Sequence, residues 1–261
     1  MWRDYFKTEY AQCNNTVIFK SVVKYHHDVI GFSFPFRADY HCCLDNVVEY
    51  CHAYNLPVIF FNVVEHDVKK LKQRFGDIKI CYYEDWSDYL YTAGTMTSLA
   101  GRKLSGQRNH INFFKRTYSD YSFEEINKDN ISDVVEFFRH QSSESGKSTD
   151  ILTEEYVKTI EVFDNYDSYN IHGGLLRVDG SIIGFSLGEI LNNVLFIHIE
   201  KADIRYRGAY QVLNNEFAKH FCSGGVKFIN RAEDNGDEGL KTAKLAYHPC
   251  KMLDKYIVEV T

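Results

Sequence analysis

The sequence lacks any run of about 18 consecutive apolar residues, the length that a membrane-spanning helix needs. Its first residues, MWRDYFKTEYAQCNN, show no apolar stretch followed by a small-residue cleavage site, so no secretory signal is visible. There are only three prolines and no long Gly/Ser-rich or single-sign tract, which excludes an extended linker or a low-complexity tail. These absences predict a cytoplasmic protein whose parts pack closely together.

Cysteine is present, but without the spacing of a disulfide framework. The seven cysteines are an odd number at irregular intervals, which favours a reducing compartment. The segment HCCLDNVVEYCH places Cys42, Cys43 and Cys51 near two histidines, yet it lacks the paired spacings of known zinc sites. We therefore expect cysteines buried on a helix, no metal and no tightly bound cofactor.

Length and composition are those of a globular protein with room for two domains. Of the 261 residues, 44% are hydrophobic and 25% are charged. In the second half, turn residues and apolar runs predict two helices, three strands, and then helix, strand, helix and strand. Asn130 and Thr153 are the predicted N-caps of the first two helices, and Asp179–Gly180 is the predicted hairpin turn. The elements predicted here are helices 130–140, 153–163, 210–221 and 238–247 and strands 174–178, 181–191, 192–203, 226–232 and 255–260.

The first half repeats a similar rhythm of strands and helices without repeating the residues. Its predicted strands are 16–26, 28–36, 57–63 and 78–84, and its predicted helices are 43–54 and 67–75. The sequence therefore predicts a mixed α/β (α+β) fold of two similar domains, each a twisted mixed sheet flanked by helices. We expect them to comprise residues 1–125 and 126–261.

A segment from Gly101 to Tyr118 contains no carboxylate, although the chain carries a formal net charge of −6. As one helix from about Ser98 to Tyr118, it would place an apolar stripe beside a cationic sector. Solvated helix faces usually mix charges of both signs. The pattern favours an anion or phosphate site over a plain surface, and both interpretations stay open. The candidate binding residues are Arg102, Lys103, Arg108, Asn109 and Asn112.

A second candidate anion site is the segment ADIRYRGAYQ, where a strand leads through Arg205 and Gly208 directly into a helix. Backbone N–H groups at a helix start attract anions, and glycine allows close approach. Arginine can add a forked contact to phosphate.

Proton-transfer candidates lie near the end of the chain. Tyr247 and His248 end a helix that follows a strand, and either side chain could donate or accept a proton. Glu200, on the strand leading to Arg205, is a further possible base. A structural role at the edge of the core is the alternative for Tyr247.

The order of elements, with R-x-x-G after a strand and a tyrosine-bearing helix near the end, resembles the GCN5-related N-acetyltransferase (GNAT) fold. Within it, YLYTAGTMTSLAGRKLSGQRNHINFF and NRAEDNGDEGLKTAKLAYHP resemble the phosphatidylglycerol lysyltransferase C-terminal domain family. The resemblance covers nearly the whole chain. It implies tandem GNAT-like domains, similar in architecture to the Fem-type peptidoglycan aminoacyltransferases, and a chain shortened within the family's first helical region.

The resemblance also implies a reaction: membrane-linked relatives move an amino acid from aminoacyl-tRNA to a lipid. It places Arg102, Lys103, Arg108, Asn109 and Asn112 at the anionic part of the donor, and Arg205 and Gly208 at the acyl-donor loop. The GNAT loop pattern ends in glycine or alanine where this chain has Tyr210, which counts against coenzyme A.

We therefore expect an acyltransferase that uses aminoacyl-tRNA and an amine or hydroxyl acceptor, with tRNA as a partner and a small molecule or lipid as acceptor. An acyl-coenzyme A-dependent N-acyltransferase and a non-catalytic protein that binds an anion or nucleic acid are the alternatives.

Overall fold

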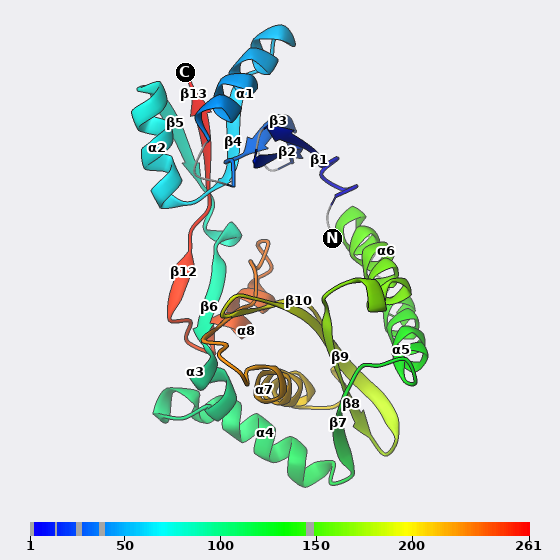
Figure 1. Ribbon diagram of the computed structural model, residues 1–261. Helices are drawn as coiled ribbons and strands as arrows, with labels where there is room; N and C mark the ends of the chain where they lie inside the picture. Colours follow the sequence, from blue (N-terminus) through cyan, green and yellow to red (C-terminus); the bar gives the residue numbers. More distant parts are fainter. Residues whose placement is uncertain (1–2, 14, 25–27, 37–39, 145–148) are drawn as a thin grey trace. The chain divides into compact units, whose positions relative to one another are not determined.

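The computed structural model describes residues 3–13, 15–24, 28–36, 40–144 and 149–261. The chain forms two compact units. One comprises Met1–Ser87, Asp150–Glu155 and Leu253–Thr261, and the other Asp88–Thr149 and Tyr156–Met252. Each unit is built on one mixed sheet with flanking helices, which confirms the predicted fold class (Figure 1).

The first unit contains a six-stranded sheet in the order β1-β2-β3-β4-β13-β5. Only β3 and β4 run parallel among the pairs recorded for this sheet. Leu44, Val47 and Cys51 recur at helical spacing and form the buried face of α1, which packs with Phe60 and Leu71 in the core. The elements are β1 (Glu9–Cys13), β2 (Thr16–Val23), β3 (Val29–Ser33), α1 (His41–Ala53), β4 (Val58–Val63), α2 (Glu65–Phe75), β5 (Ile78–Tyr82), η1 (Glu84–Trp86) and β13 (Tyr256–Val260).

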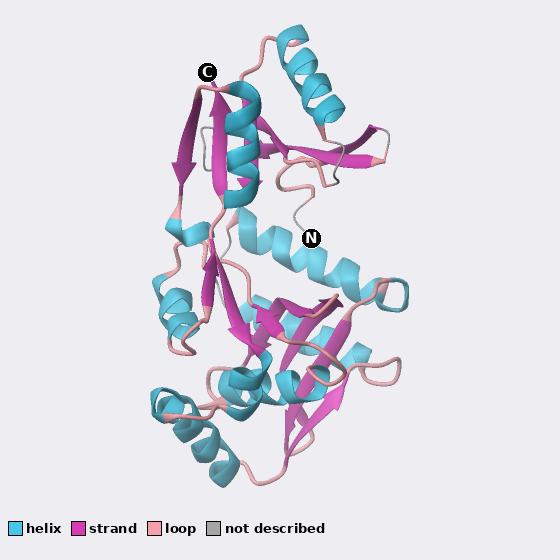
Figure 2. Cartoon of the chain, turned by 60° about the vertical axis from the view of Figure 1, so that its left-hand side comes forward, coloured by secondary structure: helices cyan, strands magenta, loops and turns pink. Residues whose placement is uncertain are grey.

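The second unit contains a seven-stranded sheet in the order β12-β6-β11-β10-β9-β8-β7. Neighbouring residues of β8 enter different cores: Leu175 packs with α5 and α6, whereas Leu176 packs with α3, α4 and α7. Helices thus cover both faces of this sheet (Figure 2). The strands are β6 (Asp88–Thr92), β7 (Tyr121–Glu125), β8 (His172–Val178), β9 (Ser181–Leu191), β10 (Val194–Ala202), β11 (Phe228–Asn230) and β12 (Lys251–Leu253). The helices and turns are α3 (Ala93–Ser98), η2 (Arg102–Leu104), α4 (Ser105–Thr117), α5 (Ile131–Glu144), α6 (Asp150–Asp164, of which Asp150–Glu155 belong to the first unit), η3 (Tyr166–Ser168), α7 (Ala209–Phe221) and α8 (Glu238–Leu245).

The compact units do not divide at residue 125, where we expected the boundary. β13, predicted as the last strand of the second domain, pairs with β4 and β5 in the first sheet (the red strand of Figure 1). In return β6, from the first half of the chain, pairs with β11 in the second sheet. Backbone hydrogen bonds between strands far apart in the sequence therefore decide the division, and no local signal marks it.

Most predicted elements form, with shifted ends. Of the predicted strand 16–26, residues 25 and 26 lie outside the described residues. The short strands β1, β6, β7 and β12 and helix α3 were not predicted. Thr153 is not an N-cap, because α6 begins three residues earlier at Asp150.

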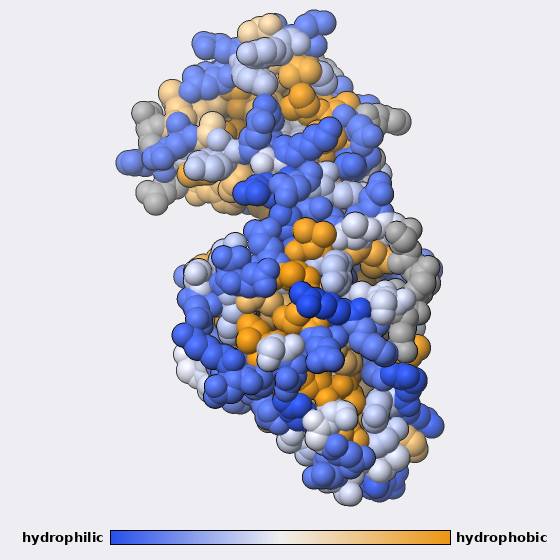
Figure 3. All heavy atoms as spheres, turned by 90° about the vertical axis from the view of Figure 1, so that its right-hand side faces the viewer, coloured by the Kyte–Doolittle hydropathy of each residue, from blue (hydrophilic) through white to orange (hydrophobic). Residues whose placement is uncertain are grey.

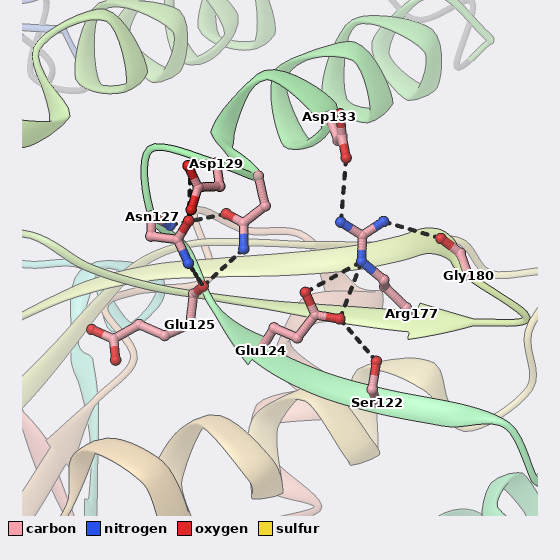
Figure 4. A network of polar contacts seen from close by, with 9 residues as sticks. Ser122, Glu124, Glu125, Asn127, Asp129, Asp133, Arg177 and Gly180 are labelled. Atoms are coloured by element: carbon pink, nitrogen blue, oxygen red, sulfur yellow. Dashed lines mark hydrogen bonds and ion pairs between the residues drawn. The ribbon is translucent and has the colours of Figure 1, made fainter.

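The turn predicted between β8 and β9 is confirmed. Asp179 and Gly180 both have positive φ, 48° and 78°, as a two-residue type I′ hairpin requires. Beside it, Arg177 of β8 ties three elements together: its guanidinium contacts Glu124 of β7 and Asp133 of α5, and donates to the Gly180 carbonyl (Figure 4). This network fixes the β7 edge of the second sheet.

The prediction of a single helix from Ser98 to Tyr118 is wrong. Leu99 is left-handed with φ of 50°, and Gly101 has φ of 91°, so the chain turns between α3 and α4. Arg108 Nη1 donates to the carbonyls of Leu99 and Gly101, the second at 2.6 Å. Asn215 of α7 donates to the carbonyls of Met96 and Thr97 at 2.8 and 2.9 Å. Side chains of α4 and α7 thus donate hydrogen bonds to the backbone carbonyl groups at the end of α3 and in the turn that follows it.

Helix α4 packs against the start of α7 at Gly208. This glycine has φ of 93° and is the N-cap of α7. A Cβ here would lie 2.7 Å from the His110 carbonyl oxygen and 3.1 Å from Phe114 Cβ. The close approach of the two helices therefore requires glycine.

We predict that Gly208→Ala lowers the free energy of unfolding by about 2 kcal/mol or more, because a left-handed alanine is strained and its methyl group meets backbone. Gly106→Ala in α4 is the matched control. Nothing lies within 4 Å of a Cβ at that position, so a gain of up to about 1 kcal/mol is expected. Urea unfolding of both variants measures the difference, and equal effects would contradict the packing of α4 on Gly208.

Candidate functional site

A cluster of buried polar side chains lies in the second unit, where β10, β11 and β6 adjoin α8. Glu200 is on β10, Arg231 follows β11 directly, and Tyr91 is on β6. Lys244 is in the last turn of α8, and Tyr247 follows that helix. We call these five residues the buried polar cluster.

Glu200 and Arg231 form its central ion pair. Arg231 Nε and Nη2 lie 3.2 and 2.7 Å from Glu200 Oε2, and the two side chains are 6% and 13% exposed for Arg231 and Glu200. Burial acts to lower the pKa of Arg231, but the Glu200 carboxylate offsets it and the pKa lies above its ordinary value. The arginine is therefore a fixed positive charge in a dry environment.

Lys244 holds the chain that leaves β11. Its Nζ donates to the carbonyl oxygens of Arg231, Ala232 and Glu233 at 2.6, 3.2 and 2.5 Å. Burial, followed by the Arg231 guanidinium, lowers the pKa of Lys244 to about 8, so the ammonium form still predominates at pH 7. Tyr91 Oη in turn donates to the Lys244 carbonyl at 2.9 Å. The cluster is thus anchored through backbone as well as side chains.

Three atoms of the cluster are buried without a hydrogen-bond partner among the described residues: Glu200 Oε1, Arg231 Nη1 and Tyr247 Oη. The Arg231 guanidinium lies 5.2 Å from the centroid of the Tyr247 ring, so these residues adjoin. Burial raises the pKa of Tyr247, whose hydroxyl therefore stays protonated at neutral pH and can donate. Buried polar atoms are normally paired, so one acceptor and two donors without a partner mark this cluster as the candidate site, where a polar ligand or an ordered water would pair them.

The sequence identified two members of this cluster and missed three. Glu200 and Tyr247 lie together in the cluster, whereas His248, in the turn after α8, has an exposed side chain and a left-handed backbone with φ of 53°. Sequence reasoning did not single out Arg231 and Lys244, because lysine and arginine are rarely buried, and it did not single out Tyr91. The position of Arg231 directly after an apolar strand was the available signal.

The five predicted anion-binding residues near α4 have different surroundings. Arg102 and Lys103 are exposed on the η2 turn, and Asn109 and Asn112 are exposed on α4. Arg108 instead turns toward the carbonyls of Leu99 and Gly101, as described above. Part of the helix charge is also compensated from outside the segment, because Lys115 pairs with Glu216 of α7 at 3.0 Å.

The predicted donor loop before α7 is occupied by intramolecular contacts. Arg205 makes a forked pair with Asp203, with Nη2 2.7 Å from Oδ2, and lowers the pKa of that carboxyl group. Gly208 faces α4. The pairing of Arg205 and the packing of Gly208 explain these residues without a phosphate ligand.

Within the part of the chain that the structure describes, no group of three or more His, Cys, Asp or Glu side chains could hold a metal ion. Among the same residues, no helix is both long enough and apolar enough to cross a bilayer. Hydrophilic residues cover most of the face shown in Figure 3, with exposed hydrophobic side chains in smaller patches.

The sequence matches the family described as phosphatidylglycerol lysyltransferase, C-terminal, over residues 1–259. The chain belongs to this family. A conserved protein of unknown function from Bacteroides thetaiotaomicron is 27% identical, with a TM-score of 0.88 over 100% of this chain and 88% of the other. An uncharacterised protein of Mycoplasmoides gallisepticum is 26% identical over a 218-residue alignment that covers 79% of this chain and 66% of that relative's length.

More distant solved structures share the fold. L-PGS from Bacillus licheniformis superimposes with a TM-score of 0.65 at 14% identity, over 97% of this chain and 83% of the other. FemX gives 0.66 at 10% identity, over 99% and 90%. The family match confirms the predicted resemblance, and these solved structures confirm its GNAT-like architecture.

We predict that Glu200→Gln lowers the free energy of unfolding by about 3–5 kcal/mol, because Arg231 would remain charged and buried without its counter-ion. Asp167→Asn is the matched control in the same unit. It breaks an ion pair to Lys128 whose side chains are 65% and 79% exposed, and a loss of less than about 1 kcal/mol is expected. Chemical denaturation compares the two, and a small loss for Glu200→Gln would show that Arg231 finds other compensation.

Proposed function

We propose that the protein is an aminoacyltransferase that moves an aminoacyl group from aminoacyl-tRNA to an amine or hydroxyl acceptor. The observation that carries the proposal is the buried polar cluster, with its open acceptor and donors, in a chain of the lysyltransferase family. The solved structures of L-PGS and FemX support it through the shared fold.

The open atoms of the cluster match what aminoacyl transfer requires. When the acceptor nucleophile attacks the ester carbonyl, negative charge develops on the carbonyl oxygen, and Arg231 Nη1 is a fixed buried donor for it. Tyr247, kept protonated by burial, would supply the proton to the departing ribose oxygen and regain one from the attacking amine or hydroxyl group, so that no net proton is lost. Glu200 Oε1 would accept a hydrogen bond from the ammonium group of the aminoacyl moiety.

The exposed residues near α4 would bind the polyanionic part of the donor. In this proposal Arg102 and Lys103 contact tRNA phosphates, and Asn109 and Asn112 add hydrogen bonds to the same strand. Arg108 supports the surface indirectly by holding the turn between α3 and α4.

We expect bulk aminoacylated tRNA in excess to raise the melting temperature, because a ligand of the native state stabilises it. Uncharged tRNA should raise it less, and acetyl-coenzyme A should leave it unchanged. Replacing both Arg102 and Lys103 with alanine should reduce the slope of log affinity against log salt by about two, one for each lost phosphate contact. A shift with acetyl-coenzyme A and none with charged tRNA would overturn the proposed donor.

Tyr247→Phe separates a catalytic from a structural role. Because the hydroxyl has no hydrogen-bond partner among the residues that the structure describes, its removal should leave the free energy of unfolding unchanged or raise it by about 1 kcal/mol. Turnover with aminoacyl-tRNA should nevertheless fall roughly 100- to 10,000-fold at unchanged donor affinity. A stable variant with the parent's rate would remove Tyr247 from the mechanism.

A further inference from the structure

Two thiols from different elements of the first unit lie in contact. Cys13 is the last residue of β1 and Cys42 is the second residue of α1, and their Sγ atoms are 3.5 Å apart. None of the seven cysteines, all of which lie among the described residues, is in a disulfide. Since a disulfide has an S–S distance of about 2.0 Å, an approach of about 1.5 Å would join the two sulfurs.

The surroundings of the two thiols suit oxidation, and those of their neighbour do not. Cys42 is exposed and Cys13 is half-buried, so a small oxidant can reach both. The Asn46 side-chain amide of α1 donates to Cys13 Sγ at 3.2 Å, which holds this sulfur beside the helix that carries Cys42. Cys43, adjacent in sequence to Cys42, is 2% exposed, and burial above all raises its pKa to about 11. Cys43 therefore stays a buried, protonated thiol.

We propose that Cys13 and Cys42 form a reversible disulfide between β1 and α1 when the protein meets a small-molecule disulfide. The Cys42 thiolate attacks one sulfur of the oxidant, breaks its S–S bond and releases one thiolate. The Cys13 thiolate then attacks Cys42 Sγ, forms the bond within the protein and releases the second thiolate. Two cysteine thiols are oxidised and one small disulfide is reduced, and the two protons lost by the cysteines pass to the two released thiolates. This modification site does not depend on the proposed function.

The test is incubation of the folded full chain with glutathione disulfide, followed by alkylation of the remaining thiols and peptide mapping by mass spectrometry. The expected result is a linked pair of peptides carrying Cys13 and Cys42, with the loss of two alkylatable thiols, reversed by dithiothreitol. Cys250 is the internal control. It is exposed without a second thiol in contact among the described residues, so it should stop at a mixed disulfide with glutathione.

Variants assign the two steps. Cys13→Ser should leave Cys42 as a lasting mixed disulfide, because the second attack is lost, whereas Cys43→Ser should form the same link as the parent. Cys42→Ser should remove the link. Lasting glutathione on Cys42 of the parent, a link to Cys43, or a disulfide between two chains would each overturn the proposal.

Discussion

The ion pair of Glu200 and Arg231 is the interaction on which the rest of the second unit's polar interior depends. Two charges this deeply buried lose most of their hydration, and only a close contact offsets that loss. The pair joins β10 to the end of β11, which run parallel. Next to this pair, Lys244 Nζ donates hydrogen bonds to the three carbonyl oxygens that follow β11. Tyr91 Oη in turn donates to the backbone carbonyl of Lys244. A dry, charged centre of this kind contributes little to net stability, which agrees with the chemical role that we propose for it.

Local patterns predicted most of the fold. Apolar runs and the Asp179–Gly180 turn between them placed β8 and β9, and helical patterns placed α1, α2 and α7, since the forces that form these elements act between near neighbours in sequence. The resemblance to the lysyltransferase family, carried by the segments around α4 and α8, added the tandem GNAT-like architecture.

What sequence reasoning missed was decided by contacts distant in sequence. The break between α3 and α4 is stabilised by Asn215, which is more than a hundred residues away in the sequence. The local helical periodicity continues across the break and therefore gave no sign of it. Arg231 and Lys244 resemble surface residues in a sequence, and only the sheet beneath them makes them buried. In the sequence, Gly208 also fitted the pattern of a phosphate-binding loop. In the structure, the space beside its Cα is occupied by α4.

The place of β13 in the first sheet has a consequence for how this protein is made. Tyr256–Val260 lies between β4 and β5 in the sheet. The edges of β4 and β5 that face it therefore have no partner until residue 260 has left the ribosome. Nearly two hundred residues are synthesised between β4 and the strand that completes it, and closing so long a loop is slow. The first sheet is therefore completed only after the second unit has been synthesised, and until then its open strand edges are exposed to aggregation and to chaperones.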